Sequence, residues 1–215
     1  MEIEKIIVLS CFHPLKLDEK HWLLREEEYL FSFKTLIKEY KNNLFFIDNS
    51  IDSILDLKNK ELRDLLSIRE FPVIYDNNFL NKDLYSSNNN EGFIKLIDGF
   101  YSKNKDFKKV IIVNGRILNT EFIIDLILRK YHKEENLFFK IDSENISTDI
   151  FLISSDYLKK LIDSLKLNSE KCLQKNFNLF VNKNNLKNIS TNLRLIKLLH
   201  TDHDDYLKTK LEYIK

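Results

Sequence analysis

Glycine, alanine, proline and cysteine are all scarce in this 215-residue chain. It contains three glycines and no alanine, whereas average glycine usage of about 7% would give roughly fifteen. Each glycine therefore needs a local explanation. The two cysteines, Cys11 and Cys172, lie far apart and form neither a disulfide framework nor a zinc-binding spacing. We expect a reduced protein whose core needs no covalent staples.

The chain also lacks an excess of charge and any long apolar run. Lys and Arg total 34 against 33 Asp and Glu, a net charge of +1, which argues against a specialist for nucleic acid or acidic substrates. No apolar stretch approaches 18 residues, and acids occupy the start where a signal peptide would be basic. We expect a cytoplasmic location. Peripheral contact with the inner membrane face through lysine-rich helices stays open.

What the sequence does contain is an alternation of short apolar runs with longer amphipathic segments. Runs rich in β-branched and aromatic residues predict strands, and apolar residues at three- and four-residue spacing predict helices. The strands are expected at 4–9, 44–47, 71–75, 108–113, 137–141 and 148–153, and the helices at 18–40, 55–66, 90–101, 120–131, 154–165 and 169–180. This order predicts one α/β domain with a mostly parallel sheet, flanking helices and a helical C-terminal part.

The most informative stretch is 108–116, in which a strand breaks into Asn114-Gly115-Arg116. Gly115 suggests either a positive φ or a close backbone approach that a β-carbon would obstruct. Arg116 would stand at the carboxyl end of a central strand, where open α/β sheets bind ligands. Its planar charged fork suits a phosphate or a carboxylate. The alternative is an ordinary turn with a surface arginine.

Polar residues follow other predicted strands as well. The loop 10–13 follows the first strand, and Asp48 ends the second. An acid there can receive a ribose or base edge, or it can equally cap the turn that begins at Ile51. Gly92 lies in the first turn of a predicted helix, where it costs about 1 kcal/mol relative to alanine. Close approach of a ligand or a strand would explain that cost.

Taken in order, these motifs resemble the nucleotide-sugar-binding half of GT-A glycosyltransferases. In particular they resemble small bacterial and viral-type members with a Gly-Arg step where others carry Asp-x-Asp. The resemblance covers roughly residues 5–153. It implies a single GT-A-like, Rossmann-like domain, with a nucleotide-binding half at 1–118 and an acceptor half with a C-terminal elaboration at 119–215. It also implies a hexosyl- or glycosyltransferase of polysaccharide biosynthesis that moves a sugar from a nucleoside diphosphate donor to a glycan or lipid-linked acceptor.

The resemblance implies a role for each matching position. The loop after the first strand would contact the base and ribose, Asp48 would bind the base edge, and the 90–92 helix start would lie against the nucleotide. The 114–116 step would sit beside the diphosphate and the donor sugar. The implied nucleotide-binding residues are Ser10, Cys11, Phe12, His13, Asp48, Asn90, Gly92, Asn114 and Gly115, with Arg116 offsetting charge on the departing diphosphate.

This sequence departs from the family pattern at the position where metal-dependent members bind their metal ion. A metal-dependent GT-A enzyme holds Mn²⁺ or Mg²⁺ through carboxylate oxygens, yet this chain has Asn114-Gly115-Arg116 at that place. Ile117 follows, not the aromatic residue common in the look-alikes. Either Arg116 and lysines neutralise the diphosphate, or another carboxylate supplies the metal. Metal use is left undecided.

An inverting transfer needs a general base, usually a carboxylate. Asp149 and Glu170 are preferred over Asp156, although Asp156 could simply cap its helix and Glu170 could simply favour a helix dipole. His203 lies in a His- and Asp-rich cluster that suits divalent ions, although a solvated surface cluster is the better interpretation. Two alternative functions remain. One is a non-catalytic binding or scaffold protein that kept the fold. The other is a nucleotidyltransferase, which would need a glycine-rich phosphate loop where this chain has residues 10–13.

Overall fold

The computed structural model describes residues 5–13, 18–40, 43–67, 73–75, 89–104, 106–118, 120–140, 145–168, 172–190 and 196–197. The strands are β1 (Lys5–Ser10), β2 (Leu44–Asp48), β3 (Val73–Tyr75), β4 (Lys109–Asn114), β5 (Ile117–Leu118), β6 (Leu137–Lys140), β7 (Ile146–Ser154), β8 (Asn188–Ser190) and β9 (Ile196–Lys197). The helices are α1 (Glu19–Tyr40), the 3-10 helix η2 (Ile54–Asp56), α2 (Lys60–Ser67), α3 (Asn89–Lys103), α4 (Thr120–Lys130), α5 (Ser155–Leu167) and α6 (Leu173–Lys183).

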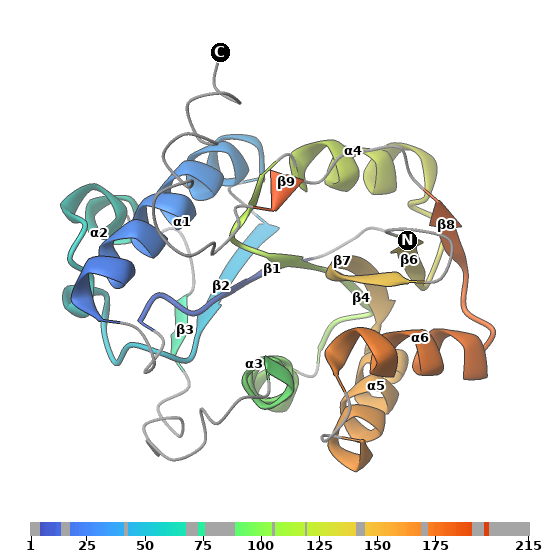
Figure 1. Cartoon of the computed structure of the whole chain (residues 1–215). Coiled ribbons are helices and arrows are strands. Elements are labelled where there is room, and N and C mark those ends of the chain that lie inside the picture. Colours follow the sequence, from blue (N-terminus) through green and yellow to red (C-terminus); the bar gives the residue numbers. More distant parts are fainter. Residues whose placement is uncertain are drawn as a thin grey trace.

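Seven strands form one sheet in the order β3-β2-β1-β4-β7-β6-β8. All neighbours are parallel except at β7, which runs antiparallel to both β4 and β6. The predicted α/β class with a mostly parallel sheet is confirmed (Figure 1). The short pair β5–β9 forms a separate antiparallel ribbon.

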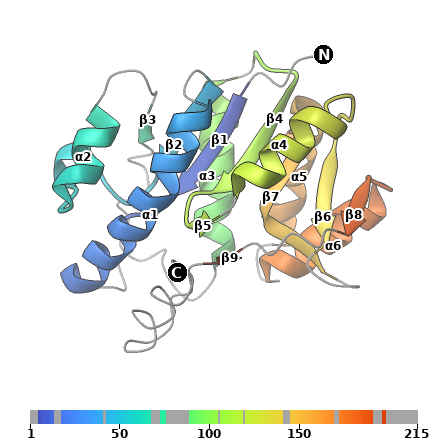
Figure 2. The same cartoon turned by 90° about the horizontal axis from the view of Figure 1, so that it is seen from above.

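Helices cover both faces of the sheet, with α1, α2 and α4 on one side and α3, α5 and α6 on the other (Figure 1). Figure 2 shows α1 and α4 lying across the same face. Successive strand residues point to opposite faces, so Val8 and Val113 join the first core and Ile7 and Ile112 the second. Since both faces are buried, the strands are continuously apolar, which is why their positions could be predicted.

The strand directions bring four polar residues to one edge. Because β1, β2 and β4 are parallel, their carboxyl ends coincide, with Ser10 opposite Asp48 and Leu9 opposite Asn114. The antiparallel strand β7 begins at this same edge, where Ile150 pairs with Val113. Residues 146–149 therefore lie beside the end of β4. This carboxyl edge is where an α/β sheet binds ligands.

The segment expected as one helix at 55–66 is instead two short helices. Ser53 and Asp56 form a reciprocal capping box around η2, and the chain leaves η2 extended at Leu57, with φ −61° and ψ 133°. The Asn59 Oδ1 atom then accepts the N–H of Leu62 at 3.0 Å and starts α2. Two local caps thus override the apolar periodicity. Strands β5, β8 and β9 were not predicted, and the expected helix start at 169–170 lies outside the described residues.

Candidate functional site at the carboxyl edge of the sheet

The carboxyl edge brings Asn114 and Asp149 into direct contact. Asn114 Nδ2 donates to Asp149 Oδ1 at 3.1 Å, and Asn114 Oδ1 accepts the backbone N–H of Arg116 at 3.1 Å. Both side chains are partly exposed. Within the described residues, this amide is the one side-chain donor to Asp149, and the second carboxylate oxygen has no protein donor. The site therefore presents a positioned carboxylate with spare acceptor capacity.

Arg116 lies beside this pair, but its guanidinium is already engaged. Its Nε donates to Glu28 Oε2 at 2.6 Å, and the two side chains are 12% and 3% exposed. The charge of Arg116 is thus offset by a buried carboxylate from α1. The Nε atom of Arg116 is therefore used by Glu28, and contact between this guanidinium and a diphosphate stays a prediction.

The predicted nucleotide-binding loop after β1 is fixed by α1. Tyr29 Oη accepts the N–H of Cys11 at 2.8 Å, and Arg25 Nε donates to the Cys11 carbonyl at 3.0 Å. The Phe12 ring is buried against Tyr29, with centroids 4.7 Å apart. Burial raises the pKa of Tyr29 to about 12, because a phenolate there would lose its hydration. The loop is therefore preformed, and its side chains largely face the interior.

Asp48 joins the loop after β1 to the loop after β2. Its carboxylate accepts the N–H groups of Phe12 at 3.1 Å, Ser50 at 2.6 Å and Ile51 at 3.1 Å. The Ser50 hydroxyl also donates to it at 2.8 Å. Burial raises the pKa of Asp48, while these hydrogen bonds oppose the rise. Asp48 has no exposed surface, so the structure gives it the turn-forming role, and its contact with a base stays a prediction.

Glu26 is a second buried carboxylate that connects three segments, and sequence reasoning missed it. It accepts the Lys58 N–H at 3.0 Å, the Asn59 N–H at 2.5 Å and a hydrogen bond from His13 Nε2. His13 also stacks on Trp22, with centroids 4.6 Å apart and planes 14° apart. The acids at the start of α1 read as ordinary dipole partners. No local signal separates Glu26 and Glu28 from their exposed neighbour Glu27.

Gly92 and Gly115, the two glycines considered for the site, have different surroundings. A Cβ at Gly115 would lie 2.7 Å from Phe33 Cε1, 2.9 Å from Val8 Cγ1 and 3.1 Å from the Leu9 carbonyl. Neither glycine has a positive φ, so close approach to the core, not a left-handed backbone, explains Gly115.

Gly92 has room for a side chain, since its nearest neighbour would be Asn49 Nδ2 at 3.8 Å. Its carbonyl accepts that amide at 3.3 Å. Asn90 lies in the first turn of α3, so the helix start expected beside the nucleotide is at the carboxyl edge. Ser10, 2% exposed, donates its hydroxyl to the Ile47 carbonyl at 3.0 Å.

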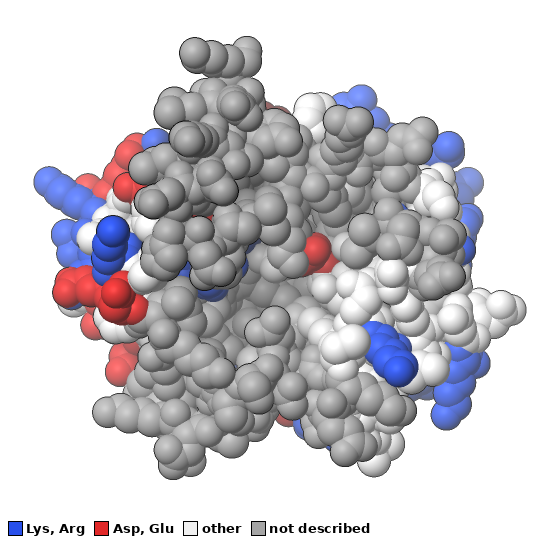
Figure 3. Space-filling model, viewed as in Figure 1, with Lys and Arg blue, Asp and Glu red and all other residues white. Residues whose placement is uncertain are grey.

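Some predicted groups remain outside the described structure, namely Glu170 and His203. In the part of the chain that is described, no three His, Cys, Asp or Glu side chains are grouped so as to hold a metal ion. Figure 3 shows acidic and basic side chains interspersed on the side of α1 and α2. Among the described helices, none is both long and apolar enough to cross a membrane.

Comparison with known proteins shows the fold. No protein-family model and no curated protein sequence matches the chain. Among solved structures, 4-diphosphocytidyl-2C-methyl-D-erythritol synthase from Anaerococcus prevotii superposes with a TM-score of 0.58 at 10% identity, covering 99% of this chain and 100% of that one. A protein from Desulfovibrio desulfuricans assigned as a nucleotide-diphospho-sugar transferase gives 0.57 at 10% identity, covering 89% and 80%. A cytidylyltransferase from Leptospira borgpetersenii gives 0.54 at 13% identity, covering 99% and 88%. The chain thus has the fold found in nucleotide-diphospho-sugar transferases and cytidylyltransferases.

Proposed function

We propose that this protein is a glycosyltransferase that moves a sugar from a nucleoside diphosphate donor to a glycan or lipid-linked acceptor. The observation that carries the proposal is the contact between Asn114 and Asp149 at the carboxyl edge. The fold is one in which solved neighbours include nucleotide-sugar transferases. The preformed loop 10–13 and the start of α3 border the same edge and are the proposed walls of the nucleotide site.

In the proposed reaction, Asp149 is the general base. The acceptor hydroxyl oxygen forms a bond to the anomeric carbon, the bond from that carbon to the diphosphate breaks, and the hydroxyl proton passes to the Asp149 carboxylate. Asn114 holds one carboxylate oxygen at 3.1 Å and leaves the other to face the acceptor. Such positioning lowers the entropic part of the barrier.

The negative charge of the leaving diphosphate needs a counter-charge. Arg116 supplies it in this proposal by exchanging Glu28 for a phosphate group, two of whose oxygens a guanidinium can bind through parallel hydrogen bonds. The described residues offer no cluster of three metal-ligating side chains, so no step is assigned to a metal ion. The exchange predicts that weakening the contact to Glu28 strengthens nucleotide binding.

A second candidate is a binding protein that kept the fold without the chemistry. The buried Arg116–Glu28 ion pair favours it, because a neutralised arginine gives a diphosphate little attraction. A cytidylyltransferase is a third candidate on fold alone. It is less favoured because residues 10–13 contain no glycine-rich phosphate loop.

Thermal unfolding with a panel of nucleotides tests the proposal. UDP or GDP should raise the unfolding midpoint in a saturable way, and Asn114→Ala should weaken binding about tenfold, or about 1.4 kcal/mol. Glu28→Gln should bind the nucleotide more tightly than the wild type. Lys38→Gln, at an 81% exposed side chain near the end of α1, is the matched surface control. The absence of a shift with any nucleoside diphosphate would count against the transferase and would favour the non-catalytic binding or scaffold protein.

A further inference from the structure

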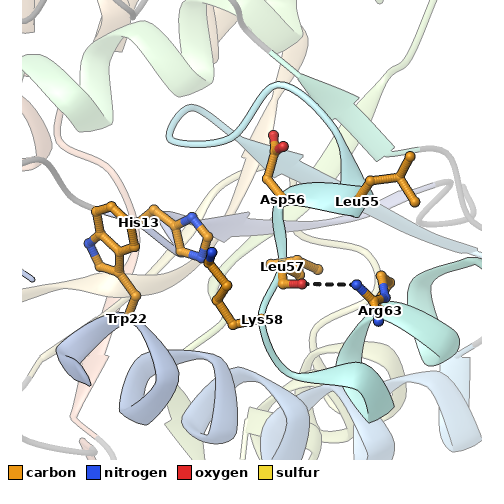
Figure 4. Close-up of a pocket in the computed structure, with 7 residues that line it drawn as sticks. All are labelled: His13, Trp22, Leu55, Asp56, Leu57, Lys58 and Arg63. Atoms are coloured by element: carbon orange, nitrogen blue, oxygen red, sulfur yellow. Dashed lines mark hydrogen bonds between the residues drawn. The ribbon is translucent and has the colours of Figure 1, made fainter. Parts of the chain in front are cut away.

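A pocket of about 480 Å³ opens beside the start of α1, away from the Asn114–Asp149 pair. It is lined by His13, Trp22, Leu55, Asp56, Leu57, Lys58 and Arg63 (Figure 4). This volume lies in the usual range for small-molecule sites. The lining comes from the loop after β1, from α1 and from the η2–α2 segment that follows β2. The pocket is therefore on the β2 side of β1, whereas Asn114 and Asp149 lie on the β4–β7 side.

One wall of the pocket is aromatic and already in place. The rings of His13 and Trp22 stack with centroids 4.6 Å apart and planes 14° apart. Glu26 holds His13 Nε2, and the Ser50 hydroxyl accepts the His13 backbone N–H at 2.9 Å. These contacts fix the orientation of the His13 ring. A fixed flat surface of this kind favours a ligand with a flat ring face.

The other side of the pocket carries positive charge. Figure 4 shows Arg63 facing the pocket from the side opposite the aromatic pair. Its Nη1 donates to the Leu57 carbonyl at a long 3.4 Å, and no carboxylate among the described residues pairs with it. Lys58 Nζ is 3.1 Å from Glu19, with side chains 44% and 65% exposed, so this pair is weak and can exchange.

The one carboxylate in the lining is partly occupied. Asp56 accepts the backbone N–H groups of Asp52 and Ser53, both at 2.9 Å, as part of the capping box of η2. Both hydrogen bonds go to Oδ2, so this oxygen of Asp56 is directed to the backbone. The guanidinium of Arg63, with its five donors in a fixed fork, is then the charged group in the lining that has no carboxylate partner among the described residues.

We propose that this pocket is a second ligand site, for a small anion carried on a flat ring. The ring packs on the His13–Trp22 stack, and the anionic group binds Arg63 and Lys58. Two compounds share this chemistry: a nucleoside monophosphate, with its aromatic base, and a sugar acid such as glucuronate, whose flat C–H face also packs on indole. The pocket shares His13 with the proposed wall of the nucleotide site. Its cationic groups, Arg63 and Lys58, belong neither to that wall nor to the Asn114–Asp149 pair, so Arg63→Gln tests this pocket separately from the proposed transferase activity.

Trp22 is the only tryptophan in the chain, so its fluorescence reports directly on this pocket. The full-length protein is titrated with AMP, UMP, glucuronate and inorganic phosphate, and calorimetry confirms each affinity. Saturable binding of AMP or UMP identifies a base as the ring, and binding of glucuronate identifies a sugar. Inorganic phosphate should bind at least about tenfold more weakly, because it lacks the ring.

Arg63→Gln should weaken the preferred ligand about tenfold, the usual loss for one charge-assisted contact. Lys38→Gln is the matched control and should bind as the wild type does. Trp22→Leu, followed by calorimetry, should lose the preference over inorganic phosphate. An unchanged thermal unfolding midpoint establishes that each variant is folded. The proposal is overturned if none of the four probes binds at about 10 mM, if phosphate binds as tightly as the ring compounds, or if Arg63→Gln binds normally.

Discussion

The carboxyl edge of the sheet divides into two regions that treat their polar groups differently. Around the loop after β1, the carboxylates of Glu26, Glu28 and Asp48 are at most 3% exposed, and each accepts hydrogen bonds from other segments. Around the end of β4 and the start of β7, Asn114 and Asp149 are partly exposed and share one hydrogen bond. We call the first the clamped region and the second the open region.

This difference in burial and hydrogen bonding suggests that the clamped region contributes to stability and the open region to reactivity. A buried carboxylate whose oxygens are satisfied is costly to disturb, because its partners would be left without acceptors or counter-charge. A partly exposed carboxylate with a free oxygen can accept a proton or a ligand at little cost to folding. Substitutions in the clamped region should therefore change the free energy of unfolding, and substitutions in the open region should change turnover.

The largest expected effect comes from Glu28→Gln. The substitution leaves the Arg116 guanidinium, 12% exposed, without its carboxylate partner, which should lower the free energy of unfolding by about 3 kcal/mol. Urea denaturation measures it. Glu27→Gln, at the exposed neighbouring position, should change stability by less than about 0.5 kcal/mol. Equal effects at the two positions would show that the ion pair contributes nothing.

A slightly smaller effect on the free energy of unfolding should appear at high pH, where Tyr29 ionises. The pKa of Tyr29 is raised to about 12 from 10.0 by burial, so between these values the unfolded chain releases the proton and the folded chain keeps it. The stabilisation is fully present below pH 10 and is lost as the pH rises to 12, by up to about 2.7 kcal/mol.

The contribution of Tyr29 is isolated by comparing the unfolding free energies of the wild type and Tyr29→Phe between pH 10 and 12. The other tyrosines and the lysines titrate in both proteins, so their effects cancel in the difference. The difference between the two proteins should narrow steadily as the pH rises. A difference that stays constant from pH 10 to 12 would mean that Tyr29 ionises equally in both states.

Gly115→Ala should cost about 2 kcal/mol, because the new Cβ would meet Phe33 and Val8 at 2.7 and 2.9 Å. Gly92→Ala is the natural counterpart. Its Cβ would lie in ordinary contact at 3.8 Å inside α3, so the change should stabilise the protein by up to about 1 kcal/mol. Opposite signs in urea denaturation are expected. A Gly115→Ala variant as stable as the wild type would contradict the close-approach explanation.

The sequence allowed the sheet to be predicted because its strands are buried on both faces. Continuous apolar runs such as 108–113 stand out without any tertiary information. The parallel order then places the residues that follow β1, β2 and β4 together. Short elements could not be found in this way. Strand β8 has three residues and β5 and β9 have two, and their pairing depends on partners distant in sequence.

The sequence predicts that the candidate residues after β1, β2 and β4 meet at one edge of the sheet, as they do, but it does not predict their contacts. Asp149 was a candidate base, yet its contact with Asn114 depends on β7 entering antiparallel with Ile150 opposite Val113, which no local pattern specifies. Arg116 reads as an anion-binding group because its partner Glu28 is 88 residues away. Glu26 and Glu28 read as surface acids because a helix dipole already explains them. For each of these residues, the contacts depend on a partner distant in the sequence, which local patterns do not reveal.

Glycosyl transfer by Asp149→Asn tests the central claim most directly. The amide can still accept the hydrogen bond from Asn114, so stability should change by less than about 0.5 kcal/mol and nucleotide affinity should be unchanged. Because the amide cannot take the acceptor proton, release of nucleoside diphosphate from the donor should fall at least about 100-fold, while Asp163→Asn, at an exposed position on α5, should match the wild type. Wild-type turnover in Asp149→Asn would contradict the account.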